Sequence, residues 1–156
     1  MNSVTVIHVG DFKEKFFRDA EAEYIKRISP FCRYNTVCVK ECDTHGESSD
    51  KLIKRALEQE AAAIRAAIPQ NSLTAALCVE GEQMTSEKFA SSVIASEKPL
   101  CFIIGSSFGL DENLKKECDL RLSFSKMTFP HMLARVMLAE QVYRGLMINS
   151  NRRYHK

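Results

Sequence analysis

The sequence predicts an α/β fold built on a parallel sheet, and three observations carry this prediction. Short apolar or β-branched runs alternate with longer segments whose apolar residues recur at helical spacing. Two of the short runs, residues 73–79 and 100–104, are apolar almost throughout, as are strands buried on both faces of a sheet. The length of 156 residues and the hydrophobic content of 45% suit one globular domain over residues 1–156. A parallel sheet with helices on both faces accounts for all three.

Five strands are expected, each a short apolar or β-branched run closed by a glycine or by polar residues. They cover residues 3–9, 34–39, 73–79, 100–104 and 120–124. Gly10 closes the first strand, and Glu80-Gly81-Glu82 is expected to turn the chain after the third. Helical segments separate the strands, and a connection of that length allows neighbouring strands to lie parallel.

Capping residues indicate where the helices begin. Asp11, with Glu14 three residues later, predicts a capping box for the first helix, which Pro30 ends. Thr85 and Asp111 are suited to cap two shorter helices. The later helices are expected over residues 50–67, 85–95, 111–118 and 130–148.

The last helix, which Pro130 is suited to open, is apolar on nearly all sides. Its main stripe consists of Met132, Val136, Ala139, Tyr143 and Leu146, and its other faces carry further Leu, Met and Val residues. Such a helix must be covered nearly all round. One small core cannot easily surround a terminal helix, so we expect a homodimer packed through it.

Composition excludes several classes of protein. No apolar run is long enough to cross a membrane, and the N-terminus lacks the basic start of a signal peptide, so we expect a cytoplasmic protein without membrane contact. The six cysteines form no C-x-x-C pair and no zinc-binding spacing, which favours reduced thiols and no metal. The net charge of +2 hides an asymmetry, because the segment from Met127 onward carries +4 and the remainder −2.

Three loops at expected strand ends predict a ligand site, because ligands of parallel sheets bind beyond the carboxyl ends of the strands. These loops are residues 80–82, 105–109 and 125–129. The second has glycines at both ends, which let the backbone approach a ligand closely, but it is neither a dinucleotide fingerprint nor a P-loop. A tight strand-to-helix turn explains it equally well. The basic C-terminus, with Tyr154 and His155, suits phosphate contact and base stacking, or is a solvated tail.

Four motifs together carry a resemblance that covers the whole chain. They are F-I-I-G with a following G-L at 102–110, M-T-F-P-H at 127–131, A-E-Q-V-Y-R at 139–144 and the terminal Y-H-K. The chain resembles the bacterial 23S rRNA (pseudouridine-N3)-methyltransferase family of the SPOUT class. This resemblance implies an α/β fold with a C-terminal trefoil knot, a homodimer, and methylation by S-adenosylmethionine. The implied substrate is N3 of a pseudouridine in the decoding-centre stem-loop of the large subunit, on the assembled ribosome.

The resemblance also assigns residues. Those implied to hold S-adenosylmethionine are Leu77, Gly81, Gly105, Ser106, Gly109, Ser125, Lys126, Met127, Thr128 and Phe129. The catalytic candidates are His155, Tyr154, His131 and Arg135, with either histidine able to take the N3 proton, Tyr154 to stack on the base and Arg135 to contact phosphate. The RNA-binding candidates are Arg144, Arg152, Arg153 and Lys156. Two alternatives stay open at this point: a non-catalytic RNA-binding or ribosome-assembly module on the same fold, and a small-molecule α/β enzyme.

Overall fold

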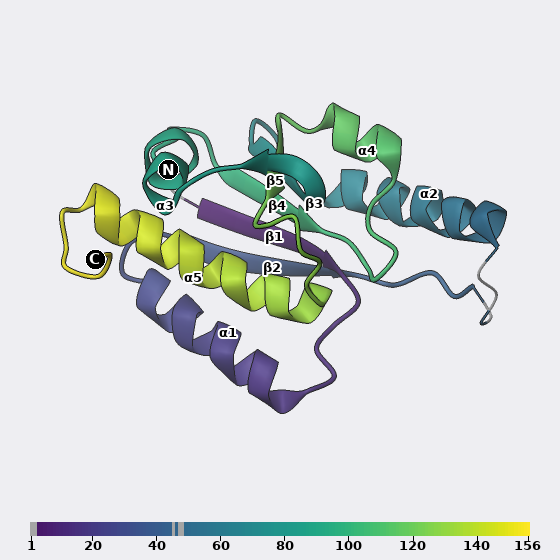
Figure 1. Cartoon of the computed structure of the whole chain (residues 1–156), viewed down its shortest axis with the longest axis horizontal. Helices are drawn as coiled ribbons and strands as arrows, with labels where there is room; N and C mark the ends of the chain where they lie inside the picture. Colours follow the sequence, from purple (N-terminus) through teal and green to yellow (C-terminus); the bar gives the residue numbers. More distant parts are fainter. Residues whose placement is uncertain (1–2, 45, 47–48) are drawn as a thin grey trace.

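A sheet of five strands organises the computed structural model, which describes residues 3–44, 46 and 49–156 (Figure 1). The strands are β1 (Ser3–Val9), β2 (Arg33–Val39), β3 (Leu73–Gln83), β4 (Leu100–Ile104) and β5 (Leu120–Ser123). The helices are α1 (Lys15–Ile28), α2 (Asp50–Ala67), α3 (Ser86–Phe89) with the π-helical turn η1 (Ala90–Ile94), α4 (Glu112–Glu117) and α5 (His131–Asn149). The strand order is β2-β1-β4-β3-β5, and every pairing is parallel.

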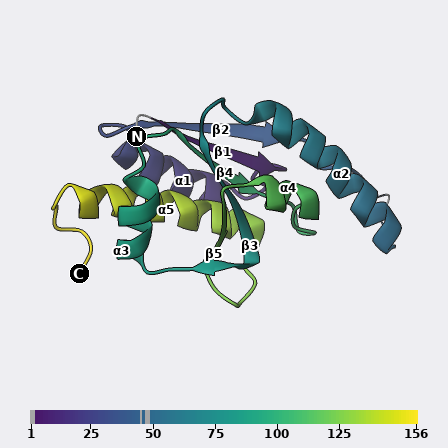
Figure 2. The same cartoon turned by 90° about the horizontal axis from the view of Figure 1, so that it is seen from above.

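Helices cover both faces of this sheet, which confirms the predicted α/β class. On one face, α1, α3 with η1, and α5 pack on side chains that include Val4, Val6 and Phe102 (Figure 1). On the other, α2 and α4 cover Ile7 and Ile103 (Figure 2). Adjacent residues of β1 therefore point into different cores, because side chains alternate across a strand.

The predicted capping box at the start of α1 is wrong. The helix begins at Lys15, three residues later than an N-cap at Asp11 implies, and its N-cap Glu14 makes no side-chain cap hydrogen bond. The Asp11 carboxylate instead accepts a hydrogen bond from the Phe12 backbone N–H and pairs with Arg135 of α5. A tertiary ion pair, which has no local signal, has replaced the local cap.

The predicted turn at residues 80–82 is also wrong, because β3 continues to Gln83. Its pairing with β5 is irregular instead: Leu77 and Glu82 both lie opposite Leu122, so the residues between them leave the ladder as a bulge. A Cβ atom on Gly81 would lie 2.7 Å from the Arg121 backbone, so this close approach to β5 requires glycine.

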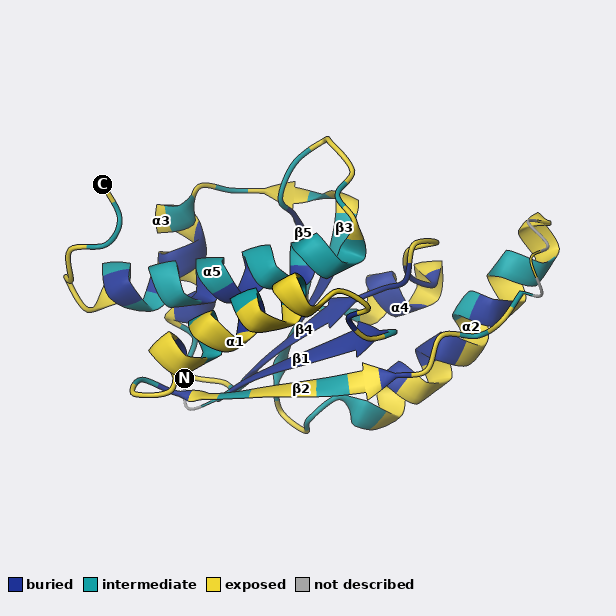
Figure 3. Ribbon diagram, turned by 90° about the horizontal axis from the view of Figure 1, so that it is seen from below, coloured by how far each residue is buried: buried dark blue, intermediate teal, exposed yellow. Residues whose placement is uncertain are grey.

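The last helix begins one residue later than expected, with Pro130 at its N-cap. Its core-facing residues include Leu138, Ala139 and Val142, and residues 131–148 are all at least half-buried (Figure 3). Across the described ranges, no helix is both long and apolar enough to cross a membrane.

Candidate functional site

A cavity of about 980 Å³ lies at the carboxyl ends of β3, β4 and β5. It is where a parallel sheet places ligands. Its lining includes eight of the ten residues proposed for cofactor contact: Leu77, Gly105, Ser106, Gly109, Ser125, Met127, Thr128 and Phe129. Gly81 and Lys126 do not line it; Gly81 packs on β5, and the Lys126 side chain is exposed. The three loops chosen from the sequence thus converge on one cavity.

The loop between β4 and α4 is folded tightly on itself. The Gly109 N–H donates to the Ser106 carbonyl at 2.9 Å, and the Phe108 N–H donates to the Ser106 hydroxyl at 3.3 Å. A Cβ atom on Gly105 would lie 2.2 Å from the Gly109 carbonyl oxygen, so only glycine allows this closure. Gly109 has φ +85°, whereas Ser106 is not among the residues with positive φ and needs no glycine.

The cavity has walls that sequence reasoning did not identify. Ile104, Leu110 and Leu122 supply apolar surface, and the first turns of α2 supply residues such as Lys54. Lys115 of α4, with only 8% of its side chain exposed, lies 2.5 Å from both Glu80 and Glu112. The hydrogen bond from Lys115 lowers the pKa of Glu80. The spacing of Glu112 and Lys115 on one helix is a local signal, whereas Glu80 lies 35 residues from Lys115 and has none.

His131 lines the same cavity from the first turn of α5 and is half-buried. Of the four predicted catalytic residues, His131 alone lines this cavity, with the loops at residues 105–109 and 125–129. Among the described residues, no cluster of three or more His, Cys, Asp or Glu could hold a metal.

The predicted tail residues form a second cluster, in which they fold back onto α5 and α3. The Tyr154 hydroxyl donates to Glu140 Oε1 at 3.2 Å, and two N–H groups of Arg144 donate to the same oxygen at 3.0 and 2.5 Å. His155 contacts Arg144 through Nδ1 at 3.2 Å and Glu87 through Nε2 at 2.7 Å. Burial is the main reason that the pKa of Tyr154 is raised to about 12. The tail is therefore held by specific partners and is not a frayed end.

A second cavity of about 330 Å³ lies beside the first. It shares Leu122, Ser123 and Phe124 with the first cavity, and it extends along α5 to Glu140 and Gln141. Glu140 is the residue that holds Tyr154 and Arg144. The second cavity therefore lies between the first cavity and Glu140, the residue that holds the tail.

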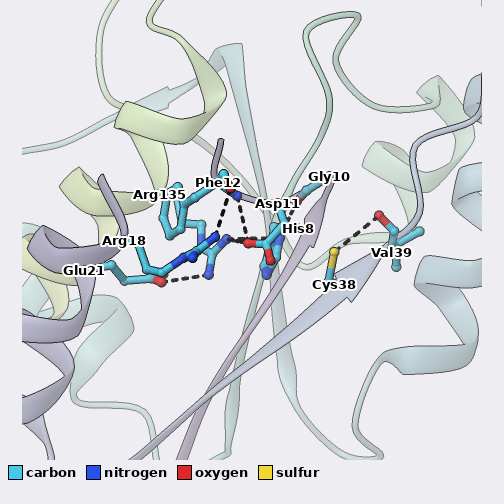
Figure 4. A network of polar contacts seen from close by, with 9 residues as sticks. All are labelled: His8, Gly10, Asp11, Phe12, Arg18, Glu21, Cys38, Val39 and Arg135. Atoms are coloured by element: carbon cyan, nitrogen blue, oxygen red, sulfur yellow. Dashed lines mark hydrogen bonds and ion pairs between the residues drawn. The ribbon is translucent and has the colours of Figure 1, made fainter. Parts of the chain in front are cut away.

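Arg135 lies elsewhere, buried between α5 and α1 (Figure 4). Its guanidinium donates to both carboxylate oxygens of Glu21, at 2.6 and 2.7 Å, and to Asp11 at 3.2 Å, and it covers the Phe12 ring at 3.9 Å. His8 is adjacent, and burial lowers its pKa. Arg135 lines neither cavity, so the expected contact with RNA phosphate does not follow from this arrangement.

The remaining basic residues lie at the outer surface of the tail. Arg152 is exposed, and its guanidinium stacks over the Phe31 ring at 4.9 Å. Arg153 and Lys156 are also exposed, on either side of Tyr154 and His155. Of the four RNA-binding candidates, Arg144 alone belongs to the tail cluster described above.

Comparison with known proteins shows which family this chain belongs to. Residues 2–155 match the family described as "Predicted SPOUT methyltransferase". A Bifidobacterium adolescentis protein named "Ribosomal RNA large subunit methyltransferase H" is 42% identical over 157 residues, which cover 98% of this chain and 99% of that protein. The Clostridium perfringens protein of that name is 39% identical, and the Methanococcus maripaludis "Putative ribosomal RNA large subunit methyltransferase H" is 40% identical, each over 99% of both chains.

A solved structure agrees with the fold. The structure of a probable methylase family protein from Haemophilus influenzae Rd KW20 aligns with a TM-score of 0.59 over 99% of this chain and 70% of that chain, at 11% identity. At that identity the likeness concerns the fold alone. The family match over residues 2–155, with relatives 39–42% identical over nearly the full length, shows that this chain belongs to the SPOUT methyltransferase family.

Proposed function

We propose that this chain transfers a methyl group from S-adenosylmethionine to N3 of a pseudouridine in 23S rRNA, in the decoding-centre stem-loop of the large subunit. The observation that carries the proposal is the adjacency of two cavities: the first is lined by the loops proposed to hold the cofactor, and the second is lined by Glu140, which binds Tyr154 of the tail. The names of the relatives, which specify large-subunit ribosomal RNA, support the choice of substrate. Residues 1–156 would act as one domain in the cytoplasm, on the assembled ribosome. A trefoil knot around the cofactor loops stays a prediction.

The first cavity suits an adenosyl cofactor in size and chemistry. Pockets that enclose ligands of this size measure about 300–1,000 Å³ and are mostly apolar with a few polar groups. Leu77, Ile104 and Leu122 would face the adenine, and backbone groups of residues 105–109 and 125–129 would orient it. When bound, S-adenosylmethionine supplies an electrophilic methyl group on a sulfonium sulfur. The contribution of the protein is then mainly to position N3 against that methyl group.

Methylation at N3 also requires loss of the N3 proton. His131 on the wall of the first cavity and His155 in the tail cluster are the candidate bases. Arg144 and Glu87 hold both ring nitrogens of His155, so this imidazole is oriented but already paired. His131→Ala and His155→Ala variants, assayed for methylation of ribosomes across pH, would separate the two, because only loss of the base removes the limb of the profile in which the rate rises with pH.

We further expect a homodimer packed through α5. Most of the apolar residues of α5, among them Met132, Leu133 and Val136, stay partly exposed in the single chain. Sedimentation of a monomer at micromolar concentration would contradict this expectation.

The direct test is mass spectrometry of ribosomal RNA from a strain that lacks this protein, with and without the gene restored. We expect one methyl group on a large-subunit pseudouridine to disappear and return. An unchanged rRNA would refute the proposed function. Calorimetry with S-adenosylmethionine then distinguishes the alternative, because a non-catalytic module would bind ribosomes but not millimolar cofactor.

A further inference from the structure

The second cavity has the form of a nucleobase pocket, with apolar walls and one polar edge. Met84, Phe89, Phe124 and Met137 supply the walls. Enzymes that act on a base usually hold it between aromatic or apolar side chains and read its edge with hydrogen bonds. Because Leu122, Ser123 and Phe124 also line the first cavity, a base in the second would lie next to the cofactor loops.

Gln141 is one of the polar residues that line this cavity, with Thr85, Ser86, Ser123 and Glu140, and its amide is fixed in orientation. The Ser86 hydroxyl donates to Gln141 Oε1 at 2.8 Å, and Gln141 Nε2 donates to Glu140 Oε2 at 2.8 Å. A flipped amide would set its oxygen against the Glu140 carboxylate, which is unfavourable. Arg144 and Tyr154 in turn hold Glu140, so the tail cluster supports the orientation of the amide.

The fixed amide retains hydrogen-bonding capacity. A glutamine amide has two N–H donors and two acceptor lone pairs. Within the ranges that the structure describes, Ser86 uses one lone pair and Glu140 one N–H. One donor and one acceptor on the same planar group are therefore available to a ligand.

This pair complements an edge that pseudouridine has and uridine lacks. In pseudouridine the sugar is attached to C5, so N1 carries a hydrogen beside the O2 carbonyl, and the edge presents a donor next to an acceptor. In uridine the sugar occupies N1, and the edge in the equivalent place presents C5–H beside O4. A side chain that binds the N1–H and O2 edge leaves N3 of the base uncovered.

We propose that Gln141 reads the N1–H and O2 edge of pseudouridine bound in the second cavity, with Phe124 and Met137 against the faces of the base. The inference rests on the proposed function and adds to it the residue that distinguishes the modified base from uridine. Glu140 and Ser86 are positioning residues for the amide. With uridine, Gln141 Oε1 would keep its bond from Ser86 but face a C–H group on the base, and the loss of that one hydrogen bond lowers the rate by roughly tenfold.

The test compares full-length parent protein with Gln141→Met, which has nearly the same shape but no amide, and with Gln141→Glu, which keeps an acceptor and loses the donor. The substrates are ribosomes that carry pseudouridine or uridine at the target position. The parent should favour pseudouridine by at least about tenfold in kcat/KM. The ratio should fall close to one in Gln141→Met and lie between in Gln141→Glu. Gln59→Met, an exposed glutamine of α2, is the matched control and should keep the parent ratio.

Calorimetry with S-adenosylmethionine is run on every variant, and unchanged cofactor affinity in Gln141→Met would assign its defect to the nucleobase. A parent-like ratio of the two substrates in both Gln141 variants would overturn the inference. A parent protein that methylates neither kind of ribosome would instead refute the proposed function, so the two failures are distinguishable.

Discussion

Removal of the Glu21 carboxylate should strongly destabilise the contact between α1 and α5. In the parent, the side chains of Glu21 and Arg135 are each 6% exposed and share two hydrogen bonds (Figure 4). In Glu21→Ala the guanidinium stays buried, and its remaining carboxylate partner is Asp11, at 3.2 Å and with a side chain 60% exposed. In the variant, the buried charge of Arg135 therefore loses its main partner and is poorly compensated.

The expected cost follows from this geometry. Removal of one partner of a buried ion pair costs about 3–5 kcal/mol. Asp11 and the Phe12 ring still contact Arg135, so we expect the lower end, about 3 kcal/mol. For a domain of this length, each kcal/mol shifts Tm by about 2–4 °C, so Tm should fall by roughly 6–12 °C. Burial raises the pKa of Glu21 by more than the contact with Arg135 lowers it, so the intact pair already carries a desolvation cost. The apolar double variant Glu21→Leu/Arg135→Met should therefore recover most of the loss.

Chemical and thermal denaturation followed by circular dichroism would measure these changes. Glu23→Ala is the matched control, because Glu23 lies on the same helix and pairs with Arg27 while both side chains are about half-exposed. Exposed pairs of this kind contribute about 0–1 kcal/mol. Equal losses in Glu21→Ala and Glu23→Ala would refute the reasoning, as would a double variant no more stable than Glu21→Ala.

Three further predictions concern the loops and the tail. Gly105→Ala should cost more stability than Gly109→Ala, because the new Cβ at position 105 would lie 2.2 Å from a carbonyl oxygen. A Cβ at position 109 would meet open space, so that variant bears only the strain of φ +85°, about 1–2 kcal/mol. Equal melting temperatures of the two variants would contradict this. The Glu87 carboxylate should titrate near pH 2, because hydrogen bonds from its own backbone N–H and from His155 lower its pKa to about 2. Its contribution to stability is then full above its ordinary pKa of 4.5 and is lost as the pH falls toward 2; a carbon-13 NMR midpoint near 4.5 would contradict this assignment. Lys115→Met should raise the pKa of Glu80, since the Lys115 hydrogen bond is the main cause of its lowering, and an unchanged carboxyl titration in the same NMR experiment would show that Lys115 is not that cause.

The order and type of the elements could be predicted because they depend on local patterns. Residues 3–9, 50–67 and 100–104 are found with the predicted bounds, since each has a periodicity and end signals within its own segment. The errors arise where a distant segment intervenes. Asp11 looks like a cap in the sequence, but its carboxylate pairs with Arg135 on the last helix. β3 passes the expected turn at residues 80–82 because β5 offers it further pairing.

The difference between local patterns and contacts from distant segments also applies to the site. The sequence by itself determined the loops at residues 105–109 and 125–129, because each follows a strand in a fold that brings strand ends together, and its motifs determined the family resemblance. Only the tertiary structure decided which polar groups meet there. Arg135 and Glu21 are 114 residues apart in the chain, and Ser86 and Gln141 are 55 apart. No local pattern encodes such pairs, because their contact depends on how whole helices pack. For that reason a predicted RNA-contacting arginine became part of a buried ion pair, and a glutamine without any sequence signal became the proposed reader of the base.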